Sequence, residues 1–437
     1  MTRHDNGGRM PAVFLLSLGC SKNTVDSERL MAQAVSSGLT FTDEVDEADI
    51  IIINTCGFIL DAKEESINET LAAIGKKEEG LVREVYVMGC LVELYRKELM
   101  EEMPEIDAFF GTRELPELLA AIGARYRQEL YDQRCLLTPP HFAWLKISEG
   151  CNRHCSFCSI PKIRGPYVSQ PIEQLLREAA LLQETGVKEL NVIAQDISLY
   201  GYDLYGKSML NDLVLRLSDM DFQWIRLLYA YPLNFPLEVI DTMHRRDNIC
   251  NYLDMPLQHI NERILRSMKR GVGRNETIRL IDEIRGRNPD IRLRTTMLVG
   301  YPGETRQEFE ELLDFVRKTR FDRLGCFPYR HEEHAPSFEL DDTVSDEEKE
   351  ARVGELMELQ EGIAAANNRK FQGRSVKAVI DTVEGDTAFG RTEYDAPEVD
   401  NDVIITIGEH RVAPGDFCFV EINDTTAHEL HGVIVNG

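Results

Sequence analysis

The sequence predicts an α/β protein in three consecutive parts, and three patterns indicate this fold class. Strand-length apolar runs alternate with helical segments over residues 11–128, which predicts an open parallel α/β domain. About six strand–helix repeats over residues 137–370 predict a partial, laterally open (β/α)6 barrel rather than a closed barrel of eight. Short alternating strands between Gly, Asp and Pro turns over residues 373–437 predict a small β-barrel.

The amino-terminal part contains three apolar runs of the kind found in strands buried on both faces. Each run is followed by a segment with helical periodicity, and the polar residues 1–10 are predicted to form a tail. The predicted strands are Ala12–Leu18, Asp49–Asn54 and Glu84–Met88, and the predicted helices are Ser21–Ser36, Asp61–Ile74, one beginning with Glu93–Met100, and a short one within Gly111–Gly123. Strands joined by helices in this way predict one parallel sheet.

Each of these three strands leads into a cysteine with a glycine beside it. The cysteines are Cys20, Cys56 and Cys90. Ligands of open α/β sheets bind at the carboxyl ends of the strands, so these thiols are expected to converge at one edge of the sheet. A single such cysteine would be an ordinary buried residue, but three at the same topological position predict a binding site. The neighbouring glycines allow the backbone to approach a bound group closely.

The middle part begins after a linker over residues 129–142 that contains Thr138-Pro-Pro140. Its predicted strands are Ala143–Ile147, Glu189–Ala194, Trp224–Tyr229, Asn251–Met255, Arg292–Val299 and Arg323–Phe327. Its predicted helices are Glu173–Glu184, Leu210–Leu217, Leu237–His244, Glu262–Met268, Thr277–Arg285 and Arg306–Lys318. Within Thr343–Phe371, a capping box at Ser345 and Glu348 predicts a helix that links this part to the last one.

The last part is strongly acidic. Its predicted strands are Ser375–Ile380, Val403–Ile407 and Phe417–Ile422. Residues 373–437 carry thirteen acidic and four basic side chains, a net charge of −9, and the whole chain carries −26. Proteins that bind nucleic acid through phosphates need a basic face, whereas an acidic surface attracts basic proteins. The charge therefore favours a basic protein partner over a nucleic acid, if it does more than keep the protein soluble.

A second cysteine group follows the first predicted barrel strand, where barrel enzymes keep their chemistry. Cys151, Cys155 and Cys158 have C-x3-C-x2-C spacing. Thiolates select iron–sulfur clusters or zinc, but structural zinc sites use four ligands and only His154 is at hand as the fourth. Three thiolates on a [4Fe–4S] cluster would leave one iron open for chemistry. A zinc knuckle or an incidental cysteine cluster remains the alternative.

With its flanks, this loop resembles the signature of the radical S-adenosylmethionine (SAM) enzymes, and in particular of their methylthiotransferase branch. The flanks are Trp144–Asn152 and Ser159–Gly165, and Asn54–Phe58 resembles the amino-terminal domain of the same branch. The resemblance extends from Ala12 to the end, where the last part resembles a TRAM domain, a small OB-like barrel. It implies two [4Fe–4S] clusters, one held by Cys151, Cys155 and Cys158 to bind SAM, and an auxiliary one held by Cys20, Cys56 and Cys90.

The resemblance also implies the reaction and the surroundings of SAM. SAM would be cleaved reductively to a 5′-deoxyadenosyl radical, which abstracts hydrogen from an unactivated carbon that then receives a methylthio group. Phe157 would lie near the adenine, and Gln195, Asp196 and Arg294 are expected near strand ends where the superfamily contacts SAM. His259 is predicted to be structural. Gly271 and Gly273 form a lone Gly-x-Gly motif, which is too weak a signal to indicate phosphate binding.

Two branches of this family differ in their substrate. One, MiaB-like, modifies an adenosine of tRNA, and the other modifies the β-carbon of an aspartate in small-subunit ribosomal protein uS12. Pro161–Gly165 and Phe321–Tyr329 resemble the protein-modifying branch, although Arg330–Pro336 departs from it. The acidic last part agrees, because a ribosomal protein is basic and tRNA is not. The MiaB-like reaction is the alternative, and a non-catalytic iron–sulfur or zinc protein, which would not cleave SAM, is a third.

The sequence also predicts a cytoplasmic protein without a membrane segment. Pro11–Cys20 could pass for a lipoprotein signal, but the same strand-Gly-Cys pattern recurs at Val85–Cys90. Thiols that bind metal need a reducing compartment. No apolar run approaches the roughly 18 residues of a membrane span. The chemistry would also need a reductant and a sulfur donor as partners, which the sequence does not identify.

Overall fold

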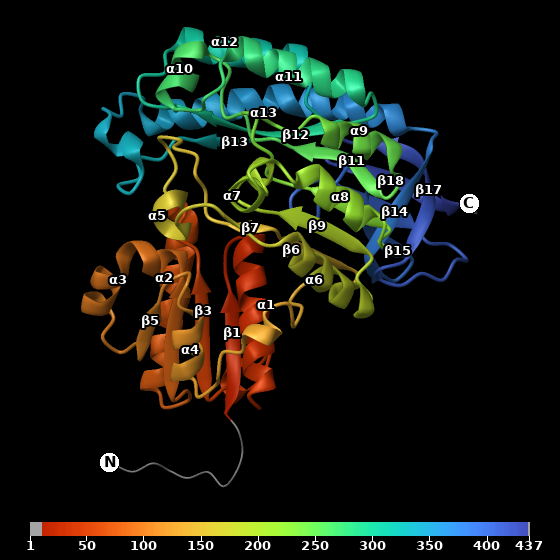
Figure 1. The fold of residues 1–437 in the computed structure, drawn as a ribbon. Coiled ribbons are helices and arrows are strands. Elements are labelled where there is room, and N and C mark those ends of the chain that lie inside the picture. Colours follow the sequence, from red (N-terminus) through yellow and green to blue (C-terminus); the bar gives the residue numbers. More distant parts are fainter. Residues whose placement is uncertain (1–10, 436–437) are drawn as a thin grey trace. The chain divides into compact units, whose positions relative to one another are not determined.

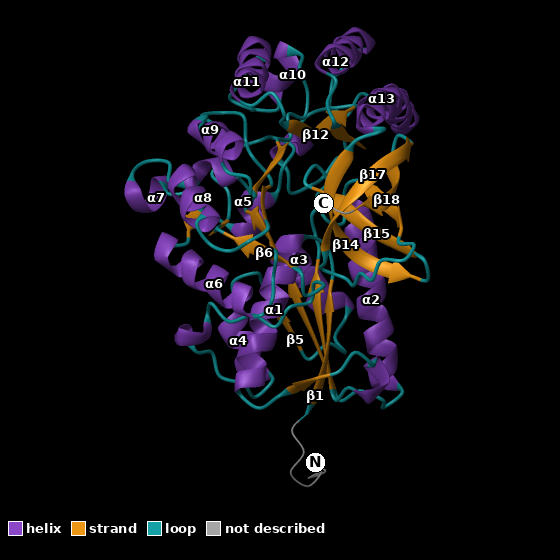
Figure 2. Ribbon diagram, turned by 90° about the vertical axis from the view of Figure 1, so that its right-hand side faces the viewer, coloured by secondary structure: helices purple, strands orange, loops and turns teal. Residues whose placement is uncertain are grey.

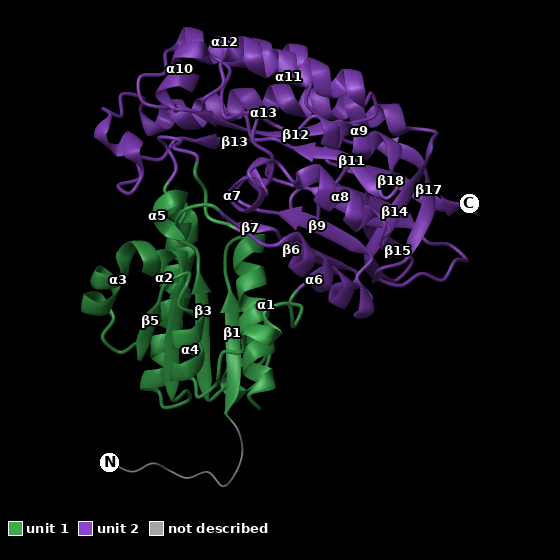
Figure 3. Cartoon of the chain, viewed as in Figure 1, with its two compact units in different colours: residues 1–137, 149–152, 159–167 green, residues 138–148, 153–158, 168–437 purple. Residues whose placement is uncertain are grey.

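The chain divides into two compact units in a computed structural model that describes residues 11–435 (Figure 3). The first unit comprises residues up to 137 together with 149–152 and 159–167, and the second comprises 138–148, 153–158 and the rest of the chain from 168. The middle and last predicted parts thus lie in one unit, while the predicted domain boundaries themselves stay predictions. The tail predicted over 1–10 and the last two residues of the predicted barrel lie outside the described residues.

The first unit contains a five-stranded sheet in the order β2-β1-β3-β4-β5, in which all neighbouring strands are parallel (Figure 1). Its strands are β1 (Ala12–Ser17), β2 (Thr40–Phe41), β3 (Ile50–Thr55), β4 (Glu84–Gly89) and β5 (Ala108–Phe110), and its helices are α1 (Ser21–Ser36), η1 (Val45–Glu47), α2 (Leu60–Glu78), α3 (Cys90–Glu102), α4 (Leu115–Ala121) and η2 (Gln128–Leu130). The predicted parallel domain is confirmed. The sequence analysis missed both edge strands, since two or three residues show no periodicity.

The isoleucine run in β3 shows why this sheet is buried on both faces. Ile51 and Ile53 pack with apolar residues of α2 and α3, whereas Ile50 and Ile52 pack with apolar residues of α1 and α4. Successive side chains of a strand point to opposite faces, so a continuous apolar run needs cover on both sides. Helices on the two faces provide that cover and hold the carboxyl ends of the strands in place.

The second unit contains a six-stranded parallel sheet in the order β13-β12-β11-β10-β9-β6, which is the partial barrel that the sequence predicts. Its strands are β6 (Phe142–Lys146), β9 (Glu189–Ile193), β10 (Trp224–Leu227), β11 (Ile249–Asp254), β12 (Arg292–Val299) and β13 (Arg323–Pro328). The short strands β7 (Ser148–Glu149) and β8 (Val168–Ser169) lie outside this sheet.

Helices follow most barrel strands. They are α5 (Ile160–Arg164), which belongs to the first unit, and α6 (Ile172–Glu184), η3 (Ile197–Leu199), α7 (Tyr202–Tyr205), α8 (Leu210–Ser218), α9 (Glu238–Arg245), α10 (Glu262–Ser267), α11 (Arg274–Arg287), α12 (Arg306–Thr319), η4 (Pro336–Glu339), α13 (Asp346–Asn368) and η5 (Arg369–Phe371). Among residues 11–435 no helix has both the length and the apolar character needed to cross a membrane.

The linking helix α13 is confirmed, with half of its predicted capping box. The Ser345 hydroxyl accepts a hydrogen bond from the Glu348 amide at 3.3 Å. The Glu348 carboxylate pairs with Arg352 at 2.8 Å, one turn further along the helix. An ion pair four residues away thus engages the side chain that a full capping box would fold back to the amino terminus.

The last part forms a closed barrel of five strands in the order β14-β15-β16-β18-β17 (Figure 2). The strands are β14 (Ser375–Glu384), β15 (Thr387–Thr392), β16 (Asp402–Thr406), β17 (Phe417–Thr425) and β18 (Glu429–Val435). The sequence analysis missed β15 and β18, whose glycines Gly390 and Gly432 interrupt the alternation. A Cβ at Gly390 would lie 2.1 Å from the Val379 carbonyl oxygen, so this barrel wall needs glycine there.

Buried arginines join this barrel to the amino ends of the parallel strands. The Glu189 carboxylate at the start of β9 accepts from Arg226 at 3.1 Å and pairs with Arg391 of the barrel at 2.8 Å. Arg323 at the start of β13 pairs with Asp395 at 2.5 Å. All of these side chains are buried. Their charges compensate one another away from water, which buried ions require.

Arg294 belongs to the same interface. Its guanidinium lies 2.9 Å from Asp254 of β11 and 3.3 Å from Asp400 of the barrel, whose carboxylate also accepts from the Tyr252 hydroxyl at 2.6 Å. Burial lowers the pKa of Arg294, but Asp254, Tyr252 and Asp400 together raise it above the ordinary value. Arg294 is therefore a charged joint between β11, β12 and the barrel.

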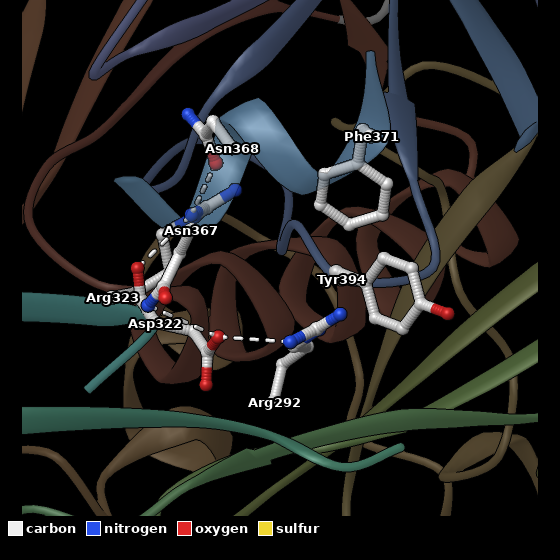
Figure 4. Close-up of a pocket in the computed structure, with 7 residues that line it drawn as sticks. All are labelled: Arg292, Asp322, Arg323, Asn367, Asn368, Phe371 and Tyr394. Carbon is white, nitrogen blue, oxygen red and sulfur yellow. Dashed lines mark hydrogen bonds and ion pairs between the residues drawn. The ribbon is translucent and has the colours of Figure 1, made fainter. Parts of the chain in front are cut away.

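A small cavity of about 10 Å³ lies where β12, β13, α13 and the β-barrel domain meet (Figure 4). It is lined by Arg292, Asp322, Arg323, Asn367, Asn368, Phe371 and Tyr394. Arg292 pairs with Asp322 at 3.3 Å, and its guanidinium lies over the rings of Phe371 and Tyr394 at 5.4 and 5.2 Å. The charged groups around the cavity are thus engaged with each other and hold α13 and the barrel to the sheet.

We expect the Arg294→Met variant to unfold at a markedly lower temperature. The substitution leaves Asp254 and Asp400 buried without their cation, which costs about 3–5 kcal/mol. Thermal unfolding of the metal-free chain measures the effect. The matched control is Arg306→Met, which removes a half-exposed arginine paired with Glu355 and is expected to cost no more than about 1 kcal/mol. Equally small decreases in the unfolding temperature of both variants would contradict the proposed role of Arg294 at the interface.

Candidate metal centres

Cys20, Cys56 and Cys90 lie at the carboxyl ends of three neighbouring strands of the first unit. Cys20 precedes α1, Cys56 follows β3 and Cys90 is the first residue of α3. Because β1, β3 and β4 are adjacent and parallel, their carboxyl ends share one edge of the sheet (Figure 1). Cys56 and Cys90 are buried, and Cys20 is exposed. The predicted convergence of these residues at one edge is observed.

Glycines bring these three loops into contact. A Cβ at Gly19 would lie 3.0 Å from the Cys56 sulfur, and a Cβ at Gly57 would lie 2.7 Å from the Leu91 backbone next to Cys90. Gly89 has φ +106°, and a Cβ there would lie 2.5 Å from the Asn54 side-chain oxygen. These glycines leave no room for a side chain, which is why each cysteine has one beside it.

Polar side chains fix the backbone that carries the cysteines. Asn23 donates to the Leu18 carbonyl at 2.9 Å and to the Thr55 carbonyl at 3.0 Å, which ties the ends of β1 and β3 together. The Ser66 hydroxyl accepts from the Cys56 amide and donates to the Cys56 carbonyl, both at 3.0 Å. Hydrogen bonds from side chains therefore fix the backbone at this edge of the sheet.

Burial controls the charge of these thiols. It raises the pKa of the Cys90 thiol to about 12, although the guanidinium of Arg164 opposes the shift. It also raises the pKa of Cys56. Both thiols are thus neutral at pH 7 until a metal displaces their protons, as metals do when they bind cysteine. Arg164, whose Nη2 lies 3.4 Å from the Cys90 sulfur, was not singled out from the sequence.

The second cysteine group occupies the loop between β7 and α5. The Cys151 amide donates to the Gly165 carbonyl at 3.1 Å within the first unit. Gly150 has φ +74°, and a Cβ there would lie 2.1 Å from the Pro166 carbonyl oxygen. In the second unit, the Cys158 amide donates to the Cys155 carbonyl at 3.2 Å. Close backbone contacts thus define the turn that carries each of these cysteines.

Cys155 lies against a cationic aromatic cluster that the sequence analysis did not identify. Its sulfur is 3.4 Å from the Tyr231 hydroxyl and 3.3 Å from Nη1 of Arg270. The guanidinium carbons of Arg270 and Arg153 lie 4.1 and 4.2 Å from the centroid of the Tyr231 ring. The buried Cys155 sulfur thus has a guanidinium donor and a phenol as neighbours. Arg270 precedes the Gly271–Gly273 segment, for which the sequence indicated no role.

The predicted adenine contact, Phe157, is half-buried in the second unit. It packs against the buried side chains of Ile264, Met268, Tyr301 and Tyr329. Ser156, the preceding residue of the loop, forms a hydrogen bond with the Tyr301 hydroxyl at 2.8 Å. This packing fixes the ring, and its contact with the adenine stays a prediction.

The end of β9 places the next two candidates. Asp196 caps η3 by accepting from the Ser198 amide at 2.8 Å, and its other oxygen accepts from Arg153 of the cysteine loop at 2.8 Å. Burial raises the pKa of Asp196, and Arg153 opposes this. Asp196 thereby positions the cysteine loop. Gln195 is half-buried beside it, and SAM contacts for both residues stay predictions.

The expected position of Arg294 is wrong. It was expected near the carboxyl end of its strand, but it is the third residue of the eight-residue β12 and faces the β-barrel interface described above. The predicted strand Arg292–Val299 already places Arg294 near the start of its strand, and the observed register sets it beside Asp254. Its SAM contact stays a prediction that the structure does not support, because its guanidinium already pairs with two carboxylates.

The donor sets suit clusters better than single ions. No three His, Cys, Asp or Glu side chains among residues 11–435 are spaced to hold one metal ion. A structural zinc site needs four ligands around one ion, whereas each triad supplies three cysteines. In a [4Fe–4S] cluster each thiolate binds a separate iron, and soft thiolate donors are the ligands such clusters use. Two triads of cysteine, each with one arginine on a sulfur, fit this group.

Three family descriptions match the chain in succession. Residues 12–111 match "Uncharacterized protein family UPF0004", residues 145–316 match "Radical SAM superfamily" and residues 373–435 match "TRAM domain". The parallel partial barrel and its three-cysteine loop therefore define the class: a radical SAM protein with a terminal TRAM barrel. The predicted fold class is confirmed in all three parts.

Curated relatives give the family within that class. The ribosomal protein uS12 methylthiotransferase RimO of Chlorobaculum tepidum is 78% identical over 99% of this chain and 100% of that protein. The RimO of Chlorobium limicola is 70% identical over 98% of this chain and 99% of that protein. The chain belongs to the RimO family, which confirms the resemblance to methylthiotransferases.

Solved structures with low identity share the fold. The radical SAM methyltransferase TsrM of Kitasatospora setae, with cobalamin and a [4Fe–4S] cluster bound, aligns with a TM-score of 0.57 at 16% identity over 75% of this chain and 77% of that chain. Its complex with tryptophan and a SAM analogue aligns with a TM-score of 0.58 over 86% and 79%. At such identity the likeness concerns the fold alone.

We expect Gly89→Ala to impair metal binding by the first triad and to destabilise the first unit. The new Cβ would overlap Asn54 and the Thr55 carbonyl, and positive φ costs about 1–3 kcal/mol for other residues. The readouts are iron and sulfide per chain after reconstitution, and the denaturant midpoint. Gly75→Ala in α2 is the matched control, since its Cβ meets nothing within 4 Å and is expected to stabilise by about 0.5–1 kcal/mol. Full metal content in Gly89→Ala would contradict this account.

Proposed function

We propose that this chain is a radical SAM methylthiotransferase that modifies the β-carbon of an aspartate in ribosomal protein uS12. The observation that carries the proposal is the 78% identity, over 99% of the chain, to a protein bearing that activity in its name. The reaction agrees with the two cysteine triads and their separate surroundings. We also propose two [4Fe–4S] clusters, one held by each triad.

Each triad has a distinct role in the proposal. Cys151, Cys155 and Cys158 would hold the cluster that binds SAM, and Cys20, Cys56 and Cys90 would hold the auxiliary cluster. When bound, the clusters and SAM supply the radical and the sulfur that the reaction needs.

The chain's own residues hold and orient these groups. Arg153 and Asp196 fix the SAM-cluster loop, while Arg270 donates to the Cys155 sulfur. Asn23 and Ser66 hold the backbone of the other triad.

The acidic barrel supports a basic protein as the substrate. Asp395 and Asp400 form ion pairs with arginines of the parallel barrel and are buried. The other acidic side chains of the domain include a set that remains exposed: Glu384, Asp386, Glu398, Asp402, Glu409, Glu421 and Asp424. Beside Glu421 on β17, Phe419 is exposed as well. Exposed acidic side chains with an apolar side chain among them suit a basic protein segment and repel tRNA phosphates.

The alternatives predict different products. A MiaB-like enzyme would place the methylthio group on an adenosine of tRNA. Binding tRNA needs a basic face, which the acidic charge of this chain does not favour. A non-catalytic protein would not cleave SAM. The reductant and sulfur donor remain unidentified partners, and a reducing cytoplasm is the compartment that free thiols of this kind require.

We expect the two triads to fail in different ways when they are removed. Cys151/155/158→Ala is expected to lose about half of the iron and all SAM cleavage. Cys20/56/90→Ala is expected to lose the other half and to keep SAM cleavage, with no methylthio product. Iron analysis, 5′-deoxyadenosine assay and product mass spectrometry measure these effects. The control is Cys135→Ala, a half-buried cysteine outside both triads. Equal iron in all variants would contradict the ligand assignment.

A competition experiment tests the substrate. Reconstituted enzyme with SAM, sulfide and reductant is offered uS12 and unmodified tRNA together, and both are examined by mass spectrometry. We expect a methylthio increment on an aspartate of uS12 and none on tRNA. The reverse result would support the MiaB-like alternative.

The same assay tests the acidic face. We expect Glu421→Lys with Asp424→Lys to raise KM for uS12 about tenfold, because reversed charge repels a basic partner, and to leave SAM cleavage without uS12 unchanged. The matched control is Glu358→Lys with Glu361→Lys, two exposed residues of α13. Equal effects of both pairs would mean that only overall charge matters, and no effect of either would exclude this face from substrate binding.

A further inference from the structure

Arg164 is a buried arginine beside the first cysteine triad. It is the last residue of α5, and its side chain is 2% exposed. Its Nη1 pairs with Asp26 at 2.6 Å and lies 3.5 Å from Glu149. Its Nη2 donates to the Asn23 side-chain oxygen and lies 3.4 Å from the Cys90 sulfur. All five residues belong to the first unit.

The two ends of the guanidinium face different groups. One nitrogen is engaged by carboxylates, which compensate the positive charge as burial demands. The other is directed at an amide oxygen and a sulfur. A neutral thiol is a weak acceptor, whereas a thiolate or a cluster-bound sulfur is an anion that forms a strong charge-assisted hydrogen bond. The placement of Nη2 is thus suited to the charged form of Cys90.

We propose that Arg164 is a positioning residue that sets the reduction potential of the auxiliary cluster. It does so by donating a hydrogen bond to the Cys90 sulfur and by placing a buried positive charge next to the cluster. This inference rests on the proposed function, in which Cys20, Cys56 and Cys90 hold that cluster. Hydrogen bonds to the sulfurs and nearby charge are among the factors that set such potentials. Reduction adds a negative charge, so the arginine favours the reduced form.

The position of Arg164 in the sequence gives this role a consequence. It lies six residues after Cys158, on the segment that also carries the SAM-cluster cysteines. The donor to one proposed cluster site is therefore covalently attached to the loop of the other.

A purely structural role makes a different prediction. An arginine that only ties α1 to the Glu149 segment through Asp26 would affect stability when removed, but it would leave the potential unchanged. Arg113 provides the comparison, because it lies next to Gly165 in the same unit, is largely exposed and pairs weakly with Glu93 at 4.0 Å. Its removal alters the charge nearby but no contact to a cysteine.

The experiment uses the full-length chain with Cys151, Cys155 and Cys158 replaced by Ala, so that only the auxiliary site is loaded. Iron and sulfide analysis first establishes cluster content. A redox titration followed by electron paramagnetic resonance then gives the midpoint potential. We expect Arg164→Met to lower the ratio of reduced to oxidised cluster at the unsubstituted midpoint about tenfold or more. Arg164→Lys is expected to give a smaller decrease, and Arg113→Met none.

The outcomes separate this inference from the proposed function. No cluster in the chain with an intact first triad would overturn the ligand assignment, and this inference with it. A fully loaded Arg164→Met with an unchanged midpoint would overturn the inference alone. If Arg164→Met does not load, Asp26→Asn decides, because it keeps the arginine and removes its counter-charge. A higher midpoint in Asp26→Asn supports the inference, and an unchanged midpoint rejects it.

Discussion

Gathering sulfur anions at the buried edge of a sheet is the constraint on which the first unit depends. Parallel strands bring their carboxyl ends together, which places Cys20, Cys56 and Cys90 close to one another but also makes their thiolates repel. Burial adds to the cost by raising the pKa of the Cys90 thiol, although Arg164 opposes the shift. Metal supplies most of the positive charge, and Arg164 supplies a fixed part of it. The glycines and amides around the edge keep this arrangement in place.

The acidic terminal barrel resolves a second electrostatic problem. Its charge of −9 would repel the rest of the chain, which carries −17. Arginines of the parallel strands, such as Arg294 and Arg323, pair with Asp400 and Asp395 of the terminal domain at the interface. The ends of the strands opposite to the cysteine loop are thereby closed, and the remaining acidic side chains stay exposed to a partner. The acidic charge of residues 373–437 thus holds the terminal barrel to the parallel strands and leaves acidic side chains exposed to a basic partner.

Local pattern decided how much of this could be predicted. The isoleucine run of β3, the helical periods and the strand-end cysteines depend on residues close together in sequence, so the parallel sheets and the cysteine positions were predictable. The edge strands β2 and β5 are too short for a period, and Gly390 and Gly432 hide β15 and β18. The ion pairs of Arg294 could not be predicted, because its partners lie 40 and 106 residues away. The contacts of Arg164 with Cys90 and of Arg270 with Cys155 could not be predicted for the same reason, since these pairs lie 74 and 115 residues apart in the sequence.

The two arginines that contact cysteines show why guanidinium is used in this fold. Arg164 divides its nitrogens between the Cys90 sulfur and Asp26, and Arg270 divides its nitrogens between the Cys155 sulfur and the Pro256 carbonyl. Lysine has a single nitrogen and could not span a sulfur and a second acceptor in a fixed geometry. A rigid fork anchored at one end keeps its other end on the sulfur. Each cysteine triad therefore has a donor whose position is set by groups outside the triad.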